Sequence, residues 1–64
     1  MLRWEPLLGF NQYNLWDGSY LIAWVYAYSP GVWTARSSDG TVKADFATPE
    51  EAMAFLNVVY GVTT

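Results

Sequence analysis

Residues 39–61, DGTVKADFATPEEAMAFLNVVYG, combine a turn, a short strand and a capped helix, and they decide the fold of this 64-residue chain. Thr48 is a suitable N-cap, because its hydroxyl can accept from a free N–H group of the first helical turn. Pro49 fits the first helical position, and Glu51, three residues after Thr48, completes a capping box. The sequence therefore predicts a helix that begins at Pro49.

The end and the buried side of this helix can also be read from the sequence. Apolar residues follow the cap at positions i, i+3, i+4 and i+7, which is one face of an α-helix: Ala52, Phe55, Leu56 and Val59. Gly61 is a typical C-terminal cap. We predict a helix over residues 49–60 that packs through this stripe.

Upstream of the helix, Asp39-Gly40 is a strong type I′ turn signal between two strand-like runs, residues 32–37 and 41–46. A turn centred there predicts these cross-strand pairs: Ser38 with Thr41, Arg36 with Lys43, Ala35 with Ala44, Thr34 with Asp45, and Trp33 with Phe46. Arg36 and Lys43 then face each other with like charge, and we expect the diagonal Asp45 to relieve the repulsion.

Two further strands are expected before this hairpin. Residues 19–28, SYLIAWVYAY, are apolar on both sides, which is typical of a central strand. A second Asp-Gly, at 17–18, joins it to a weaker strand at about 10–16, and residues 1–9 are expected to be irregular. The sequence predicts a single α+β domain over residues 1–64. Its antiparallel β-meander has three to four strands, followed by one C-terminal helix packed on one face of the sheet.

The amino-acid composition limits the classes of function that the chain can have. The chain has four Trp, five Tyr and three Phe but no His or Cys, which are the usual carriers of neutral acid–base, nucleophilic and soft-metal chemistry. Turns and the helix start account for four of the six carboxylates, and no Gly-rich phosphate loop is present. We expect no enzyme activity, no metal and no cofactor.

Charge and hydropathy limit the kinds of partner that the chain is expected to bind. Three cations against six carboxylates give a net charge of −3, which is unlike a phosphate-tracking surface. Residues 18–35 carry no charge, but a Pro-Gly pair and a period of two argue against a membrane-spanning helix. We find no signal-peptide pattern at the N-terminus, and we expect a cytoplasmic protein.

The expected fold leaves one face of the sheet without a helix. If Asp17-Gly18 and Pro30-Gly31 are two-residue turns, the large side chains of residues 19–28 face the helix and the small ones form an apolar stripe on the other side. A stripe with a polar rim is typical of an interface, and a mean hydropathy of +0.09 favours one. The predicted partner-binding residues are Leu21, Ala23, Val25, Ala27, Thr34, Arg36 and Lys43. The alternative is that the N-terminal segment folds over the stripe.

A three-residue loop at Ser29-Pro30-Gly31 would shift the register by one residue and invert the two faces. Four aromatic side chains, Tyr20, Trp24, Tyr26 and Tyr28, would then form an exposed platform. Trp24 would lie beside Arg36, within reach of a cation–π contact. In this alternative the candidate nucleic-acid-binding residues are Trp24, Arg36 and Lys43.

Residues 31–56 resemble the plant AP2/ERF and integrase-type DNA-binding domains. The matching residues are Trp33, Ala35, Phe46, Glu50, Glu51 and Ala52. The resemblance implies a three-stranded sheet followed by a helix, and DNA reading by Trp and Arg side chains on strands. The chain is also similar in style to short aromatic proteins encoded by bacteriophages.

From these features we expect a non-enzymatic protein–protein interaction module. It would self-associate through the open sheet face, and a phage-encoded modulator or inhibitor of a host protein fits this description. The alternative function is AP2-like nucleic-acid binding.

Overall fold

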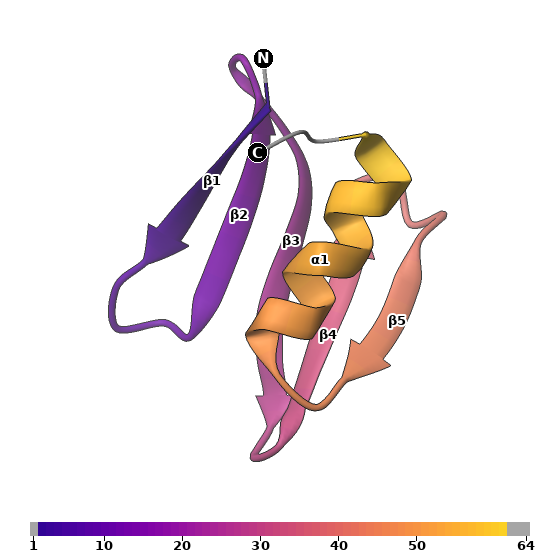
Figure 1. The fold of residues 1–64 in the computed structure, drawn as a ribbon. Helices are drawn as coiled ribbons and strands as arrows, with labels where there is room; N and C mark the ends of the chain where they lie inside the picture. The colour runs from indigo at the N-terminus through magenta and orange to yellow at the C-terminus, as the bar shows by residue number, and fades with distance from the viewer. Residues whose placement is uncertain (1, 62–64) are drawn as a thin grey trace.

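Residues 2–61, which the computed structural model describes, form an α+β fold with a five-stranded antiparallel sheet and one C-terminal helix (Figure 1). The sheet has one strand more than the upper limit of the prediction. The strands follow one another as a meander in the order β1-β2-β3-β4-β5. Their bounds are β1 Leu2–Leu7, β2 Gln12–Asp17, β3 Tyr20–Ser29, β4 Val32–Ser37 and β5 Lys43–Phe46, and α1 is Pro49–Tyr60.

The additional strand is β1, so the expectation of an irregular segment over residues 1–9 is wrong. All six residues of β1 pair with β2, from Leu2 opposite Asp17 to Leu7 opposite Gln12. Pro6 is compatible with this strand because β1 lies at the sheet edge, where one side of the backbone needs no partner. The N-terminal segment therefore widens the sheet and does not fold over it.

Helix α1 begins and ends at the predicted residues. The Thr48 hydroxyl accepts from the Glu51 N–H at 3.2 Å and donates to the Glu51 carboxylate at 3.1 Å. Gly61 has φ 69° and its N–H donates to the Asn57 carbonyl, which satisfies one of the free carbonyl groups at the helix end. Local capping chemistry thus fixes both ends of the helix.

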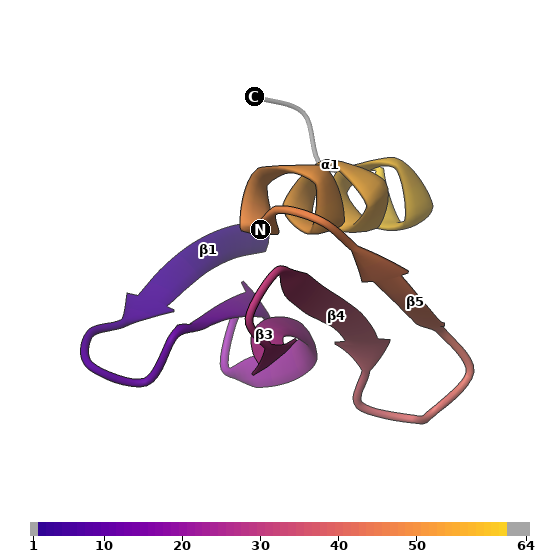
Figure 2. The ribbon, with the colours of Figure 1, turned by 90° about the horizontal axis from the view of Figure 1, so that it is seen from below.

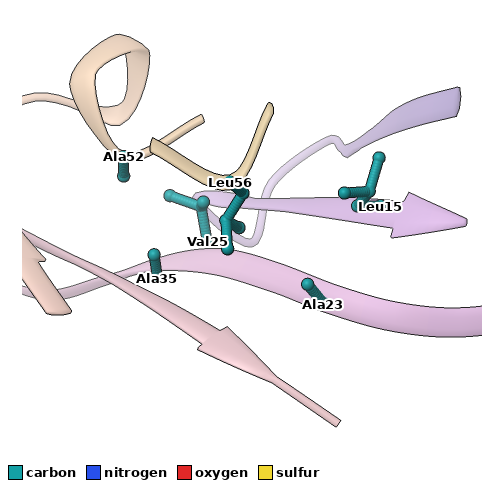
Figure 3. Packing of buried hydrophobic residues seen from close by; sticks show 6 residues of the cluster. All are labelled: Leu15, Ala23, Val25, Ala35, Ala52 and Leu56. Carbon is teal, nitrogen blue, oxygen red and sulfur yellow. The ribbon is translucent and has the colours of Figure 1, made fainter. Parts of the chain in front are cut away.

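The core lies between α1 and one face of the sheet (Figure 2). Its fully buried members come from β2, β3, β4 and the helix, and Figure 3 shows them together: Leu15, Ala23, Val25, Ala35, Ala52 and Leu56. Three of these six are alanines, which allow the helix to approach the sheet closely. Larger rings pack around this centre, including Phe46 against Phe55 with 5.3 Å between their centroids.

A hydrogen bond ties the edge strand β1 to the helix. The indole N–H of Trp4 donates to the side-chain oxygen of Asn57 at 2.8 Å, across 53 residues of sequence. Trp4 pairs with the buried Leu15, so its ring lies on the helix side of the sheet. This contact extends the core beyond the three strands β3, β4 and β5, against which α1 packs directly.

The turn between β2 and β3 differs from the prediction. Asp17 pairs with Tyr20, so the two turn residues are Gly18 and Ser19 rather than Asp17 and Gly18. Gly18, with φ 60°, takes the first central position, as in a type II′ turn. Ile22 is then an extra residue in β3, because Leu15 pairs with Ala23 while Trp16 pairs with Leu21.

The turn between β3 and β4 has two residues, Pro30 and Gly31, but the register after it is not the predicted one. Ser29 pairs with Val32 while Ala27 pairs with Trp33, so Tyr28 is a second extra residue in β3. This bulge shifts the pairing by one residue and inverts the faces, as the alternative with a three-residue loop would have done. The small side chains of β3 therefore face the helix, and Trp24 pairs with Arg36 on the other side.

The hairpin of β4 and β5 has the four predicted pairs within its strands, from Trp33 with Phe46 to Arg36 with Lys43. Its loop is longer than the predicted type I′ turn. The Gly40 N–H donates to the Ser37 carbonyl at 3.2 Å, and the Ser37 N–H donates to the Val42 carbonyl at 3.0 Å, so four residues connect the two ends. The Asp39 carboxylate accepts from the Ser37 hydroxyl, the Thr41 N–H and the Thr41 hydroxyl. These hydrogen bonds, that from Ser37 foremost, lower the pKa of Asp39 to about 2.

Candidate functional site: the open face of the sheet

The candidate site is the sheet face opposite the helix, which we call the open face. Side chains alternate along a strand, so the neighbours of the buried Leu15, Val25 and Ala35 point to this side. The open face consists of Arg3, Glu5, Leu7, Gln12, Asn14, Trp16, Leu21, Trp24, Tyr26, Thr34, Arg36, Lys43 and Asp45. Figure 2 shows the sheet curving toward the helix at both edges, so the open face is convex.

One row of side chains crosses all five strands in register. Glu5 pairs with Asn14, Asn14 with Trp24, Trp24 with Arg36, and Arg36 with Lys43. Trp24 is half-buried and occupies the centre of this row. Its ring is therefore flanked by a short amide on one side and by two cationic side chains on the other.

On the β1 side of the open face, the charged side chains have partners within the face itself. The indole N–H of Trp16 donates to the Glu5 carboxylate at 2.8 Å. The Arg3 guanidinium lies over the Trp16 ring, 5.7 Å from its centroid, in cation–π geometry. Arg3 and Glu5 thus both contact the same indole ring, and opposite charges lie next to each other.

Short polar side chains fill the space between the rings. Asn14 is only 6% exposed, and its side-chain oxygen accepts from the Gln12 amide at 2.9 Å. Thr34 is 2% exposed, and its hydroxyl donates to the Asp45 carboxylate at 2.8 Å. The described part of the chain contains no buried side-chain polar atom without a hydrogen-bond partner. The open face is therefore ordered by its own side-chain hydrogen bonds.

On the β4–β5 side of the open face, the positive charges are not compensated. Arg36 and Lys43 are both exposed and directly opposite each other. Asp45 was expected to relieve their repulsion, but its carboxylate accepts a hydrogen bond from Thr34 instead. Within residues 2–61, no hydrogen bond or ion pair of either cationic side chain is formed. Like charges in this position cost stability, and an anion bound between them would offset that cost.

All three cations of the chain, Arg3, Arg36 and Lys43, lie on the open face, together with only two of its six carboxylates. The other four carboxylates belong to the turns and the first turn of the helix: Asp17, Asp39, Glu50 and Glu51. A chain with net charge −3 therefore presents a surface with an excess of positive charge.

The structure separates the predicted partner-binding residues into two groups. Ala23 and Val25 are fully buried under the helix, so their expected place on the open face is wrong. Ala27 pairs with Trp33, which packs against the core, so its expected place on the open face is also wrong. Leu21 is half-buried and lies on the open face, opposite Trp16. Thr34, Arg36 and Lys43 do lie on the open face. All three residues of the nucleic-acid alternative, Trp24, Arg36 and Lys43, lie there side by side.

Sequence reasoning missed the β1 contribution to this face and the position of Trp16. The contacts of Arg3 and Glu5 with Trp16 depend on a strand that was not predicted. A period-two pattern over Leu2, Trp4 and Pro6 is present in the sequence, but a proline within it weakened the strand signal.

Comparisons of the chain with protein-family models, with curated proteins and with solved structures found no match. Within residues 2–61, helix α1 is too short to cross a bilayer. In the same range, no three carboxylate, His or Cys side chains gather in a way that could hold a metal ion. The open face itself is therefore the basis for a functional argument.

Proposed function

We propose that this protein is a non-enzymatic protein-binding module, and that its open face docks an acidic surface of a partner protein. The observation that carries the proposal is the uncompensated pair of Arg36 and Lys43 beside the half-buried ring of Trp24. Carboxylates of a partner would neutralise the two cations, and Trp24 would supply apolar contact area next to them.

The composition of the open face supports protein binding. Trp, Tyr and Arg are the residue types most enriched at the energetic centres of interfaces. Trp16, Trp24 and Tyr26 form the aromatic part of this face, and charged side chains lie toward both edges. An aromatic centre with a polar rim is the usual anatomy of a protein interface.

The sheet edges are less suited to a partner than the face. The edge strand β1 contains Pro6, which cannot donate to an added strand, and the edge strand β5 has only four residues. Two of those four, Lys43 and Asp45, are exposed and charged. These features oppose strand addition, so binding through the convex open face is favoured.

Phosphate binding by the same cations is the competing function. Three cations are few for a polyanion, and Glu5 and Asp45 share their surface, so carboxylates of a protein are the better match. A modulator or inhibitor of a partner protein fits a domain of this size that binds through one face.

The test begins with a photo-reactive benzoylphenylalanine in place of Tyr28, which is 73% exposed beside the open face. The matched control carries the same group in place of Val58, which is 83% exposed on the helix. We expect the Tyr28 probe to crosslink one defined acidic protein in cell lysate, and the Val58 probe to leave it unlabelled. Mass spectrometry then identifies the protein for purification.

Affinity for the purified partner decides the proposal. We expect Arg36→Gln and Lys43→Gln each to weaken binding about fivefold to tenfold, which corresponds to about 1–1.4 kcal/mol. Val58→Ala should leave the affinity unchanged. Unchanged affinity in both glutamine variants would overturn the proposal. So would tighter binding of a DNA or RNA oligonucleotide with a steep salt dependence. A dimer mass in light scattering that Arg36→Glu returns to the monomer mass would also overturn the proposal, because a second copy would then occupy the open face.

A further inference from the structure

A hollow of about 210 Å³ lies on the open face and is lined by Tyr26, Tyr28, Thr34, Lys43 and Asp45. Its origin is a row across three strands, in which Tyr26 pairs with Thr34 and Thr34 pairs with Asp45. Threonine is much shorter than the tyrosine in this row and one bond shorter than the aspartate. The hollow therefore has a short, buried floor between an aromatic wall and a charged one.

The charged wall is oriented before any ligand arrives. The Thr34 hydroxyl donates to the Asp45 carboxylate at 2.8 Å, and Thr34 itself is only 2% exposed. A carboxylate has about four acceptor positions, and this bond uses one of them. Asp45 can thus accept further hydrogen bonds from a ligand, while the Lys43 ammonium, two residues along the same strand, can donate.

We propose that this hollow binds a single neutral sugar ring, an activity that goes beyond protein docking by the open face. A pyranose has an apolar face that packs on an aromatic ring, and hydroxyl groups that both donate and accept. Asp45 would accept from two neighbouring hydroxyls, Lys43 would donate to a third, and the rings of Tyr26 and Tyr28 would contact the apolar face. The volume suits one ring, because drug-sized ligands need pockets of about 300 Å³ or more.

Other ligands fit the hollow less well. Lys43 and Asp45 carry opposite charges, so the lining has no net charge and favours neither a cation nor an anion. A nucleotide also offers a flat ring, but Asp45 in the lining would repel its phosphate, and Lys43 is the one cation of the lining that could offset this repulsion. A neutral ring with several hydroxyl groups uses both charged side chains without this repulsion.

The experiment is a titration of the ¹⁵N-labelled protein with glucose, galactose, mannose and N-acetylglucosamine, each up to about 100 mM, followed by amide chemical shifts. We expect saturable shifts from at least one sugar at Tyr26, Tyr28, Thr34, Lys43 and Asp45, with millimolar affinity. Asp45→Asn keeps an oxygen for Thr34 but removes the charge, and it should weaken binding at least fivefold. Tyr26→Ala should abolish binding.

Tyr20→Ala is the matched control, because Tyr20 is 76% exposed and lies outside the hollow. It should bind the sugar as the wild type does. A thermal melt of each variant separates loss of binding from loss of fold. The proposal is overturned if no sugar gives saturable shifts in the hollow, if Asp45→Asn binds normally, or if adenosine monophosphate shifts the same amides at lower concentration. Arg36→Gln should leave sugar binding intact, so this result is independent of protein docking.

Discussion

The two faces of the sheet are built from different kinds of residue. The face under α1 is centred on small and medium aliphatic side chains, among them Ala23, Val25 and Ala35, which are fully buried. The open face carries the large ring of Trp24, the cations Arg36 and Lys43, and a network of side-chain hydrogen bonds.

This difference teaches that the fully buried centre of the core is aliphatic, while the aromatic side chains of the covered face pack around that centre. The helix needs close approach, and alanines provide it by occupying little space. Trp24 and Tyr26 remain half-buried on the other side, where they keep apolar area available to a partner. One face is therefore organised for stability and the other for contact.

The largest effect should come from a charge placed on the covered face. Val25→Glu puts a carboxylate where the side chain is fully buried, and within residues 2–61 all cationic side chains lie on the opposite face of the sheet. A domain of 64 residues has only about 3–10 kcal/mol of stability, and a buried unpaired charge costs about 4 kcal/mol or more. We expect the variant to be unfolded by far-ultraviolet circular dichroism.

The control for this prediction is Arg36→Glu on the open face, which should fold with an unchanged spectrum. A folded Val25→Glu protein would mean that the two faces are assigned the wrong way round. The sequence pattern favoured the inverted assignment, because it placed Val25 in the open stripe.

The helix allows the same comparison on a smaller scale. Leu56 is fully buried against the sheet, whereas Val58, two residues later, is 83% exposed. Leu56→Ala should lower the free energy of unfolding by about 2–5 kcal/mol, since it removes buried apolar atoms and leaves a cavity. Val58→Ala should change it by less than about 0.5 kcal/mol. Urea denaturation of both variants measures the difference, and equal losses would contradict the packing of α1 through Leu56.

The sequence predicted the helix and the β4–β5 pairing well, because their signals are local. Thr48, Pro49 and Gly61 carry the capping chemistry of the helix within a few residues of its ends. In the hairpin, the four observed pairs agree with the polar and apolar alternation of both strands. Turn chemistry and side-chain pattern agreed there, although the loop itself is longer than predicted.

The sequence left two registers open and did not favour the observed one, because two single-residue bulges decide which side chains form the open face. Ile22 and Tyr28 are ordinary strand residues, and nothing in their neighbours indicates that they lack a partner. Each extra residue inverts every side chain beyond it, so a local event has a consequence for the whole strand. The edge strand β1 was missed for a related reason, since its pairing with β2 is visible only once the sheet exists.

A smaller effect is expected from the loop that joins β4 and β5, which belongs to neither face. Its hydrogen bonds from Ser37 and Thr41 lower the pKa of Asp39 from 3.8 to about 2. The depressed pKa means that the folded state holds the proton less tightly than the unfolded state. The stabilisation is therefore complete above pH 3.8 and is lost as the pH falls from 3.8 toward 2.

Asp39→Asn tests this contribution. The asparagine keeps an acceptor oxygen but cannot ionise. The slope of the free energy of unfolding against pH should therefore fall between pH 4 and pH 2, by up to the contribution of about one bound proton. Urea denaturation at several pH values in this range measures the slope. An identical slope in the variant and the wild type would contradict the lowered pKa of Asp39. Neither face of the sheet should be disturbed.

The smallest expected effect concerns the opposed cations of the open face. Lys43→Glu replaces a repulsive cross-strand pair with an attractive one, so it should raise the free energy of unfolding by about 0.2–1 kcal/mol at low salt. The gain should disappear near 1 M salt, where the screening length is only about 3 Å. Lys43→Gln removes the repulsion without adding attraction, so its free energy of unfolding should lie between those of the wild type and Lys43→Glu. The same Lys43→Glu change should weaken binding of an acidic partner. A variant that is more stable yet binds less well would show that the cation pair is retained for contact, whereas a loss of stability would mean that Arg36 and Lys43 do not repel each other.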